Sequence, residues 1–118
     1  MDTFIKESEL KVMEVLWQQN RAMTVSEMVN LCKETVDKKI NYIRLLVNAL
    51  CDKGILKCVG SKRLTKNFAA IYEPALTKAE YYIELLKPSE KEALQIVELL
   101  INNFDDDFTV EINKLLTR

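Results

Sequence analysis

The sequence predicts a mainly α-helical chain with one small β-hairpin, and three observations predict it. Apolar residues recur at helical spacing over most of the 118 residues. The chain holds two Gly and two Pro, which leaves little room for the many tight turns of a β-rich fold. A short stretch after Gly54 is instead patterned as two strands around a polar loop.

The first two helices are predicted over residues 7–19 and about 26–35. Both have apolar residues at helical spacing, and the first has two acids in its first turn, where the helix dipole favours them. Thr24 and Glu27 have the spacing of a capping box at the start of the second helix. After a turn, Asp37 is the expected cap of a third helix.

Residues 38–53 are predicted to form this third helix, with one apolar and one polar face. The apolar face consists of Ile40, Ile43, Leu46, Val47 and Leu50. The opposite face carries Lys38, Asn41, Arg44 and Asn48, with Leu45 among them. Asn and Arg side chains read base edges, Lys neutralises phosphate, and an exposed Leu can meet a thymine methyl. An ordinary solvated helix surface has a similar pattern, so this helix does not by itself decide between the two interpretations.

A hairpin is predicted directly after the third helix. Residues 55–59 and 68–72 are patterned as strands, and Pro74 ends the second one. The loop between them, residues 60–67, is polar and carries the cations Lys62, Arg63 and Lys66. A helix-turn-helix followed by a hairpin is a winged helix, and a basic wing is well placed to touch phosphates beside the groove that the helix enters. The alternative is an exposed loop whose charge only keeps it soluble.

The last third of the chain is predicted to form helices over residues 77–86, 89–103 and 109–116. The expected domains are therefore a winged helix over residues 1–76 and a helical dimerisation region over residues 77–118. The second holds much apolar surface but is short for an independent core, so we expect a homodimer. A monomer whose helices fold back onto the first domain is the alternative. The residues expected at the dimer interface are Tyr82, Leu86, Leu94, Val97, Leu100, Ile101, Phe104, Ile112, Leu115 and Leu116.

The charge is unevenly distributed along the chain. Residues 1–76 contain 12 Lys and Arg against 9 Asp and Glu, whereas residues 77–118 contain 5 against 9. The segment 37–66 contains 8 basic residues against 2 acidic ones. Because this segment includes the polar helix face, the pattern predicts a surface that faces an anion and an acidic part that does not.

Other features exclude several function classes. No apolar run approaches the roughly 18 residues of a membrane span and no signal peptide opens the chain, so we expect a cytoplasmic protein. Cys32, Cys51 and Cys58 lie in apolar patterns and are expected to be reduced core thiols. With no His and no Cys-based motif, nothing nominates an enzyme, a cofactor, a metal ion or a small-molecule substrate.

Nearly the whole chain resembles the penicillinase-repressor (BlaI/MecI/CopY) family of bacterial transcription regulators. The resemblance lies in residues 8–17 (SELKVMEVLW), residues 41–54 (NYIRLLVNALCDKG) and residues 72–76 (YEPAL). It implies a dimeric winged-helix repressor that binds double-stranded operator DNA. From the third helix and the basic loop, the residues that we expect to contact DNA are Lys38, Lys39, Asn41, Tyr42, Arg44, Leu45, Asn48, Lys62, Arg63 and Lys66. The rival interpretation is a winged-helix protein-interaction module that does not bind DNA sequence-specifically.

The chain departs from the family pattern at positions that bear on specificity. Tyr42 and Leu45 stand where the family commonly has Thr, and Ala49 stands where it often has a basic residue. Operator preference is therefore expected to differ, and base-by-base contacts do not carry over. Lys6 also stands where the family often has a Ser cap.

The resemblance also bears on regulation. Family members that control β-lactam resistance are inactivated when an Asn-Phe bond in the dimerisation region is cleaved, after a membrane sensor metalloprotease is activated by the antibiotic. Asn103 and Phe104 stand at the corresponding position, which leads to the hypothesis that this chain is cleaved there. The copper-responsive branch uses a cluster of Cys near the C-terminus, and no Cys follows Cys58, so metal sensing of that type is disfavoured.

Overall fold

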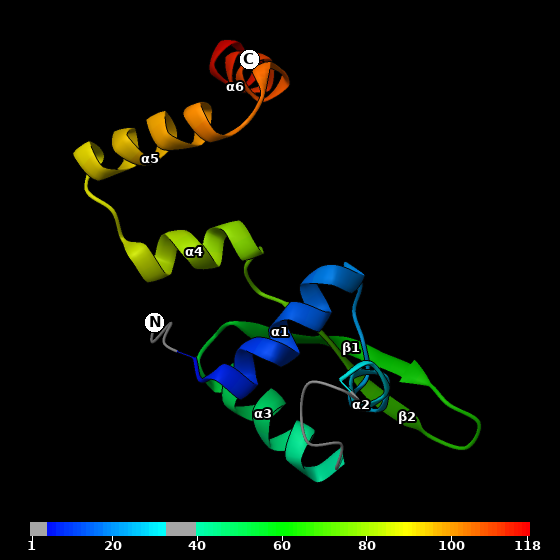
Figure 1. The fold of residues 1–118 in the computed structure, drawn as a ribbon. Helices are drawn as coiled ribbons and strands as arrows, with labels where there is room; N and C mark the ends of the chain where they lie inside the picture. The colour runs from blue at the N-terminus through cyan, green and yellow to red at the C-terminus, as the bar shows by residue number, and fades with distance from the viewer. Residues whose placement is uncertain (1–4, 33–39) are drawn as a thin grey trace. The chain divides into compact units, whose positions relative to one another are not determined.

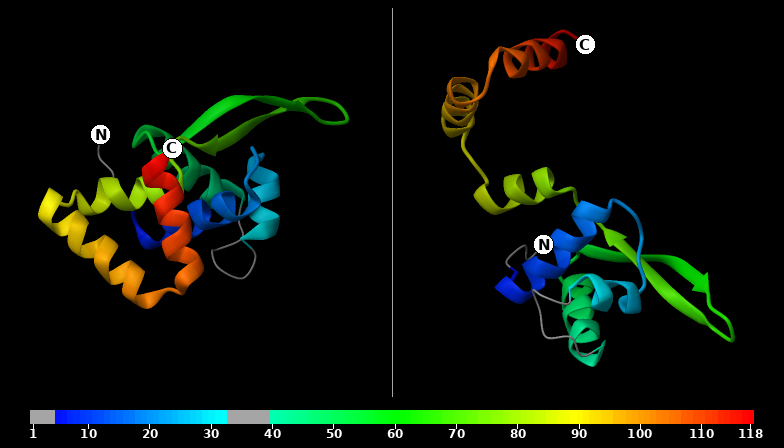
Figure 2. Two further views of the ribbon diagram at one scale, coloured as in Figure 1. Left: turned by 90° about the horizontal axis from the view of Figure 1, so that it is seen from above. Right: turned by 45° about the vertical axis from the view of Figure 1, so that its right-hand side comes forward.

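The computed structural model describes residues 5–32 and 40–118 (Figures 1 and 2). Its elements are, in chain order, α1 (Glu7–Gln19), α2 (Val25–Leu31), α3 (Ile40–Asp52), β1 (Leu56–Arg63), β2 (Phe68–Pro74), α4 (Lys78–Leu86), α5 (Glu90–Asn103) and α6 (Asp106–Thr117). The predicted fold class, mainly helical with a small antiparallel hairpin after a helix-turn-helix, is confirmed. None of the described helices is long and apolar enough to cross a membrane.

The chain forms two compact units, residues 1–85 and residues 86–118. The first includes α4, since Tyr81 of this helix is only 4% exposed and its ring centroid lies 5.7 Å from that of Trp17 in α1. The Trp17 indole N–H in turn donates a hydrogen bond of 3.0 Å to the carbonyl of Leu76. The predicted boundary after residue 76 stays a prediction, because packing within one chain does not say which part folds alone.

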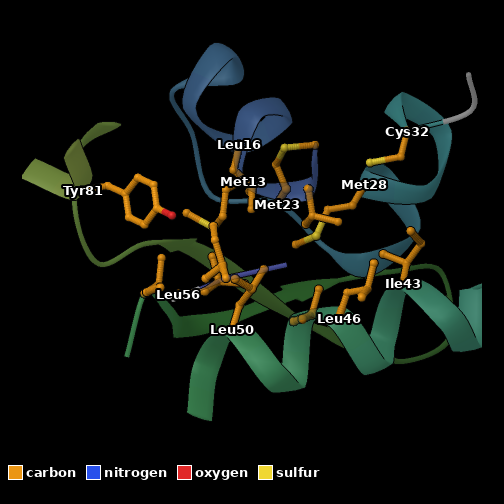
Figure 3. Close-up of a cluster of buried hydrophobic side chains, with 14 residues drawn as sticks. Met13, Leu16, Met23, Met28, Cys32, Ile43, Leu46, Leu50, Leu56 and Tyr81 are labelled. Atoms are coloured by element: carbon orange, nitrogen blue, oxygen red, sulfur yellow. The ribbon is translucent and has the colours of Figure 1, made fainter. Parts of the chain in front are cut away.

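The core of the first unit lies where α1, α2 and α3 meet one side of the hairpin (Figure 3). Its buried side chains are Ile5, Val12, Met13, Leu16, Met23, Met28, Cys32, Ile43, Leu46, Val47, Leu50, Ile55, Leu56 and Tyr81. The prediction that Ile40 belongs to the buried face is wrong, because Ile40 is 41% exposed. Ile40 is the first residue of α3, and helical side chains tilt toward the N-terminus, so it projects past the end of the core.

The hairpin is longer than the sequence pattern predicted. β1 runs to Arg63, so Lys62 and Arg63 lie on a strand and Lys66 lies in the turn, where the Leu64 N–H donates a 2.7 Å hydrogen bond to Asn67. The register shifts between Cys58 and Gly60, where Gly60 has a φ of 150° that a side chain would strain. This part of β1 is solvated on both sides, so it lacks the apolar alternation that reveals a strand.

Other boundaries also differ from the predictions. α2 ends at Leu31 rather than near residue 35. α6 begins at Asp106 rather than at residue 109, because the Asp105 carboxylate accepts the Phe108 N–H at 3.2 Å and caps the helix. The predicted turn and cap at residues 35–37 lie outside the described residues.

The three cysteines occupy different environments. Cys32 is buried and Cys51 is half-buried, but Cys58 is exposed. The prediction of a core thiol is therefore wrong for Cys58, since β1 leaves the core after Leu56. Burial raises the pKa of the Cys32 and Cys51 thiols, which favours their neutral form.

A buried ion pair joins α1 to the end of α3. Glu9 is 2% exposed, and its Oε1 lies 2.7 Å from the Nζ of Lys53. The same oxygen accepts the backbone N–H of Lys6 at 2.8 Å, which is one half of a capping box; the Lys6 side chain, having no acceptor, cannot supply the other half. Burial by itself raises the pKa of Glu9, but these two hydrogen bonds outweigh it and hold the pKa below its ordinary value.

We predict that Lys53→Ala lowers the free energy of unfolding by about 2–3 kcal/mol, because it leaves the Glu9 carboxylate buried without its cation. Urea unfolding followed by circular dichroism measures the change. The matched control is Lys57→Ala, which removes an exposed 3.6 Å pair with Glu73 and should cost less than about 0.5 kcal/mol. Equal losses in the two variants would contradict a special role for the buried pair.

Candidate nucleic-acid interface

The outward face of α3 is set by what the helix buries. Ile43, Val47 and Leu50 are fully buried against α1 and α2, and this fixes the rotation of the helix about its axis. The opposite face is exposed and presents Asn41, Arg44, Leu45 and Asn48, as the sequence predicted. Leu45, at its centre, is 66% exposed. Lys38 and Lys39 lie outside the described residues.

Tyr42 lies apart from this outward face. Its side chain is half-buried and packs against the core, on the turn of α3 next to buried Leu46. The sequence grouped Tyr42 with the groove-facing residues, but the helical period places it at the border between the two faces. Any contact of Tyr42 with a ligand would come from the exposed part of its side chain.

A hollow of about 420 Å³ lies between α3, the start of α2 and the wing. Its lining residues come from all three elements: Thr24, Val25, Ser26, Arg44, Asn48, Leu64, Asn67, Phe68, Ala69, Ala70 and Tyr72. The polar side of α3 and the wing therefore border one concavity. Backbone hydrogen bonds hold the wing in this place, since Met23 and Tyr72 exchange N–H···O bonds of 2.9 and 2.8 Å just before α2.

The acid Glu27 of α2 organises the charge beside the hollow. Its carboxylate accepts the Thr24 backbone N–H at 3.0 Å and an Arg21 N–H at 2.8 Å. Its Oε2 also lies 3.8 Å from the Nζ of Lys62 on the wing. The hydrogen bonds from Thr24 and Arg21 lower the pKa of Glu27 to about 2, so it stays ionised in mild acid as well as at neutral pH. Lys62 is thus partly neutralised within the molecule.

The other two wing cations face solvent. Arg63 and Lys66 are both exposed, and no ion pair within the described part of the chain involves them. They lie at the end of the hairpin, one on β1 and one in the turn. Positive charge at this end is therefore available to an anionic partner, as the sequence predicted.

Sequence reasoning missed Phe68 and Ala70, which line the hollow from β2. The available signal was the alternation of Phe68, Ala70 and Tyr72, which puts the three side chains on one face of the strand. Only the tertiary structure shows where this face of the strand points, because there Tyr72 packs against the core.

The predicted dimerisation residues remain largely uncovered. Tyr82, Leu86, Leu94, Val97, Leu100, Phe104, Leu115 and Leu116 are exposed, and Ile101 and Ile112 are half-buried. Neither α5 nor α6 has a buried residue. Several large apolar side chains of these two helices therefore lack the cover that a folded core would give them.

The Asn103–Phe104 bond lies where α5 ends. Phe104 has extended backbone (φ −113°, ψ 173°) and is 57% exposed, and its ring centroid lies 4.9 Å from that of Phe108 in α6. The Asn103 side-chain amide donates a hydrogen bond of 2.7 Å to the Leu99 carbonyl. The bond is thus in a short connection between helices rather than inside one.

Comparison with solved structures finds two mutants of Lactococcus lactis ZitR. One is 17% identical with a TM-score of 0.47, covering 99% of this chain and 74% of that one. The other, a double mutant, is 18% identical with a TM-score of 0.42, covering 98% and 75%. No curated protein matches the chain. The family model described as penicillinase repressor matches residues 5–117, which is almost the whole sequence. The chain therefore belongs to the penicillinase repressor family of transcriptional regulators.

Proposed function

We propose that this protein represses transcription by binding a two-fold symmetric operator in double-stranded DNA as a homodimer. The observation that carries the proposal is that the outward face of α3 and the basic end of the wing border one hollow. A helix of this kind fits the major groove, and a wing beside it reaches the flanking phosphates. The shape of α3 and the charge of the wing therefore suit binding to the same DNA duplex.

The positions of the side chains suggest a division of tasks on α3. Asn41 and Leu45 are exposed and do not line the hollow, so we assign them to base edges. Arg44 lines the hollow, so we assign it to a phosphate of the strand beside the groove. Asn48 also lines the hollow, and we assign it to neither task. Lys38 and Lys39 are proposed as phosphate contacts from the sequence alone.

Dimerisation is proposed from the exposed apolar surface of α4, α5 and α6. Two short helices without a buried residue are not a stable core, whereas a second copy would cover them. A dimer would also present two α3 helices, which suits a palindromic site. Membership of the family supports this assembly, since its members act on DNA as repressors.

Regulation by proteolysis follows from the same proposal. The Asn103–Phe104 bond is exposed and precedes α6, which holds Ile112, Leu115 and Leu116 of the proposed interface. Cleavage there would separate α6 from the rest of the chain, weaken the dimer and release the operator. A membrane sensor metalloprotease in a β-lactam-resistance circuit is the proposed partner.

Protection mapping on the DNA upstream of the protein's own gene tests the proposed function. We expect a footprint with two-fold symmetry and an affinity that falls steeply with added salt, because phosphate contacts release counterions. The absence of a footprint, or a flat response to salt, would favour the protein-interaction module instead.

Two variants of α3 are matched controls in the same assay. Asn41→Ala should weaken operator binding by about 1–3 kcal/mol and leave unrelated DNA unaffected, as the loss of a base contact predicts. Arg44→Ala should weaken binding to the operator and to unrelated DNA, and should lower the slope of log affinity against log salt concentration by about 1. If the two variants behave alike, the proposed division of tasks is wrong.

Glu27→Gln is expected to strengthen DNA binding. Gln still accepts the Thr24 N–H, but Arg21 and Lys62 both lose their anionic neighbour and become available to phosphate. The salt slope should increase by up to about 1, measured by fluorescence anisotropy with a labelled duplex. Glu73→Gln is the control, since it changes net charge equally beside Lys57. An identical gain in that control would assign the effect to net charge rather than to Arg21 and Lys62.

Incubation with the cognate sensor protease should yield fragments of residues 1–103 and 104–118, which mass spectrometry resolves. Phe104 is exposed and extended, and because its N–H donates to the Leu100 carbonyl, cleavage requires only the last turn of α5 to open. Phe104→Ala, which alters only one side of the bond, is expected to slow cleavage. An intact wild-type chain would remove proteolysis from the proposal while leaving DNA binding in place.

A further inference from the structure

Phe68, the first residue of β2, is 67% exposed although its strand face leads into the core. Along this face Phe68 alternates with Ala70 and Tyr72, and Tyr72 packs against the core. Of the three side chains on this face of β2, Tyr72 lies nearest the core and Phe68 lies farthest from it. With two thirds of its surface exposed, the ring is open to a partner.

The surroundings of Phe68 combine apolar surface with positive charge. Phe68 and Leu64 line the hollow from the wing, Arg44 and Asn48 line it from α3, and Ala70 leaves space between them. Arg63 stands opposite Phe68 in the strand register, and Lys66 lies in the adjoining turn. Arg44 thus lines the hollow itself, and the wing cations Arg63 and Lys66 are neighbours of the residues that line it from the other side.

A nucleic-acid strand has the complementary chemistry. Its backbone alternates phosphate anions with deoxyriboses whose carbon faces are apolar. A bare anion would gain nothing from the ring, and an uncharged apolar ligand would gain nothing from the cations. A sugar–phosphate unit uses both, which selects DNA backbone as the occupant.

We propose that one strand of the bound duplex passes through this hollow and that Phe68 packs against the apolar face of a deoxyribose. Arg44 and Arg63 then face the phosphates on its two sides. The proposal rests on the proposed DNA binding and adds a contact that anchors the wing on the strand. Because a phenyl ring cannot hydrogen-bond to base edges, this contact provides affinity and register rather than sequence preference.

Equilibrium binding of wild type, Phe68→Ala and Phe68→Leu to the upstream duplex and to an unrelated duplex of equal length tests this assignment. Phe68→Ala should weaken binding to both by at least about fivefold, as the loss of buried aromatic surface predicts. The slope of the salt dependence should not change, because no counterion is involved, whereas Lys66→Ala should lower it by about 1. Phe68→Leu should be intermediate.

The other outcomes have separate meanings. Unchanged binding by Phe68→Ala overturns the inference while DNA binding stands, and a loss on the upstream duplex alone overturns it in favour of a base contact. A changed solution mass with unchanged DNA binding would assign the ring to a contact between copies, which also overturns it. If wild type binds neither duplex, the proposed function fails and this contact fails with it. Thermal unfolding of Phe68→Ala should match wild type, since the ring is exposed.

Discussion

The first unit depends on the buried pair between Glu9 and Lys53. It joins the beginning of α1 to the residue that follows α3, 2.7 Å apart, and Glu9 also accepts the backbone N–H of Lys6 at the start of α1. A carboxylate that is 2% exposed is costly without its cation, so the pair ties the two helices together at this end. The buried stripe of α3 then determines which of its faces is turned to solvent.

Electrostatics around the hollow follow from one acid. Glu27 caps α2, binds Arg21 and lies near Lys62, so a single carboxylate stabilises the helix start and restrains the wing beside it. Its low pKa keeps this arrangement charged even in mild acid. Within the described part of the chain, Arg63 and Lys66 therefore carry free positive charge, whereas Lys62 lies beside an anion, which a count of basic residues does not reveal.

The second unit poses a different physical problem. α5 and α6 begin with side-chain caps, Ser89 accepting the Glu92 N–H and Asp105 accepting that of Phe108, so their ends are locally well defined. Their apolar side chains nevertheless remain exposed. Local interactions thus specify these helices, and covering their apolar face needs a partner surface. The apolar surface of α5 and α6 thus supports the proposed dimer, and the proposed cleavage site lies between the same two helices.

Local signals in the sequence determined the helices, the hairpin, the outward face of α3 and the family, because helical period, capping boxes and Gly54 act over a few residues. They did not reveal that β1 continues to Arg63 or that Ile40 and Cys58 are exposed. The start of α6 at Asp106 was missed although its cap, Asp105, is itself a local signal. Only the tertiary structure decided which cations are already paired and that Phe68 shares a hollow with Arg44. The reason is physical: pairing and concavity arise between elements distant in sequence, where no local period records them.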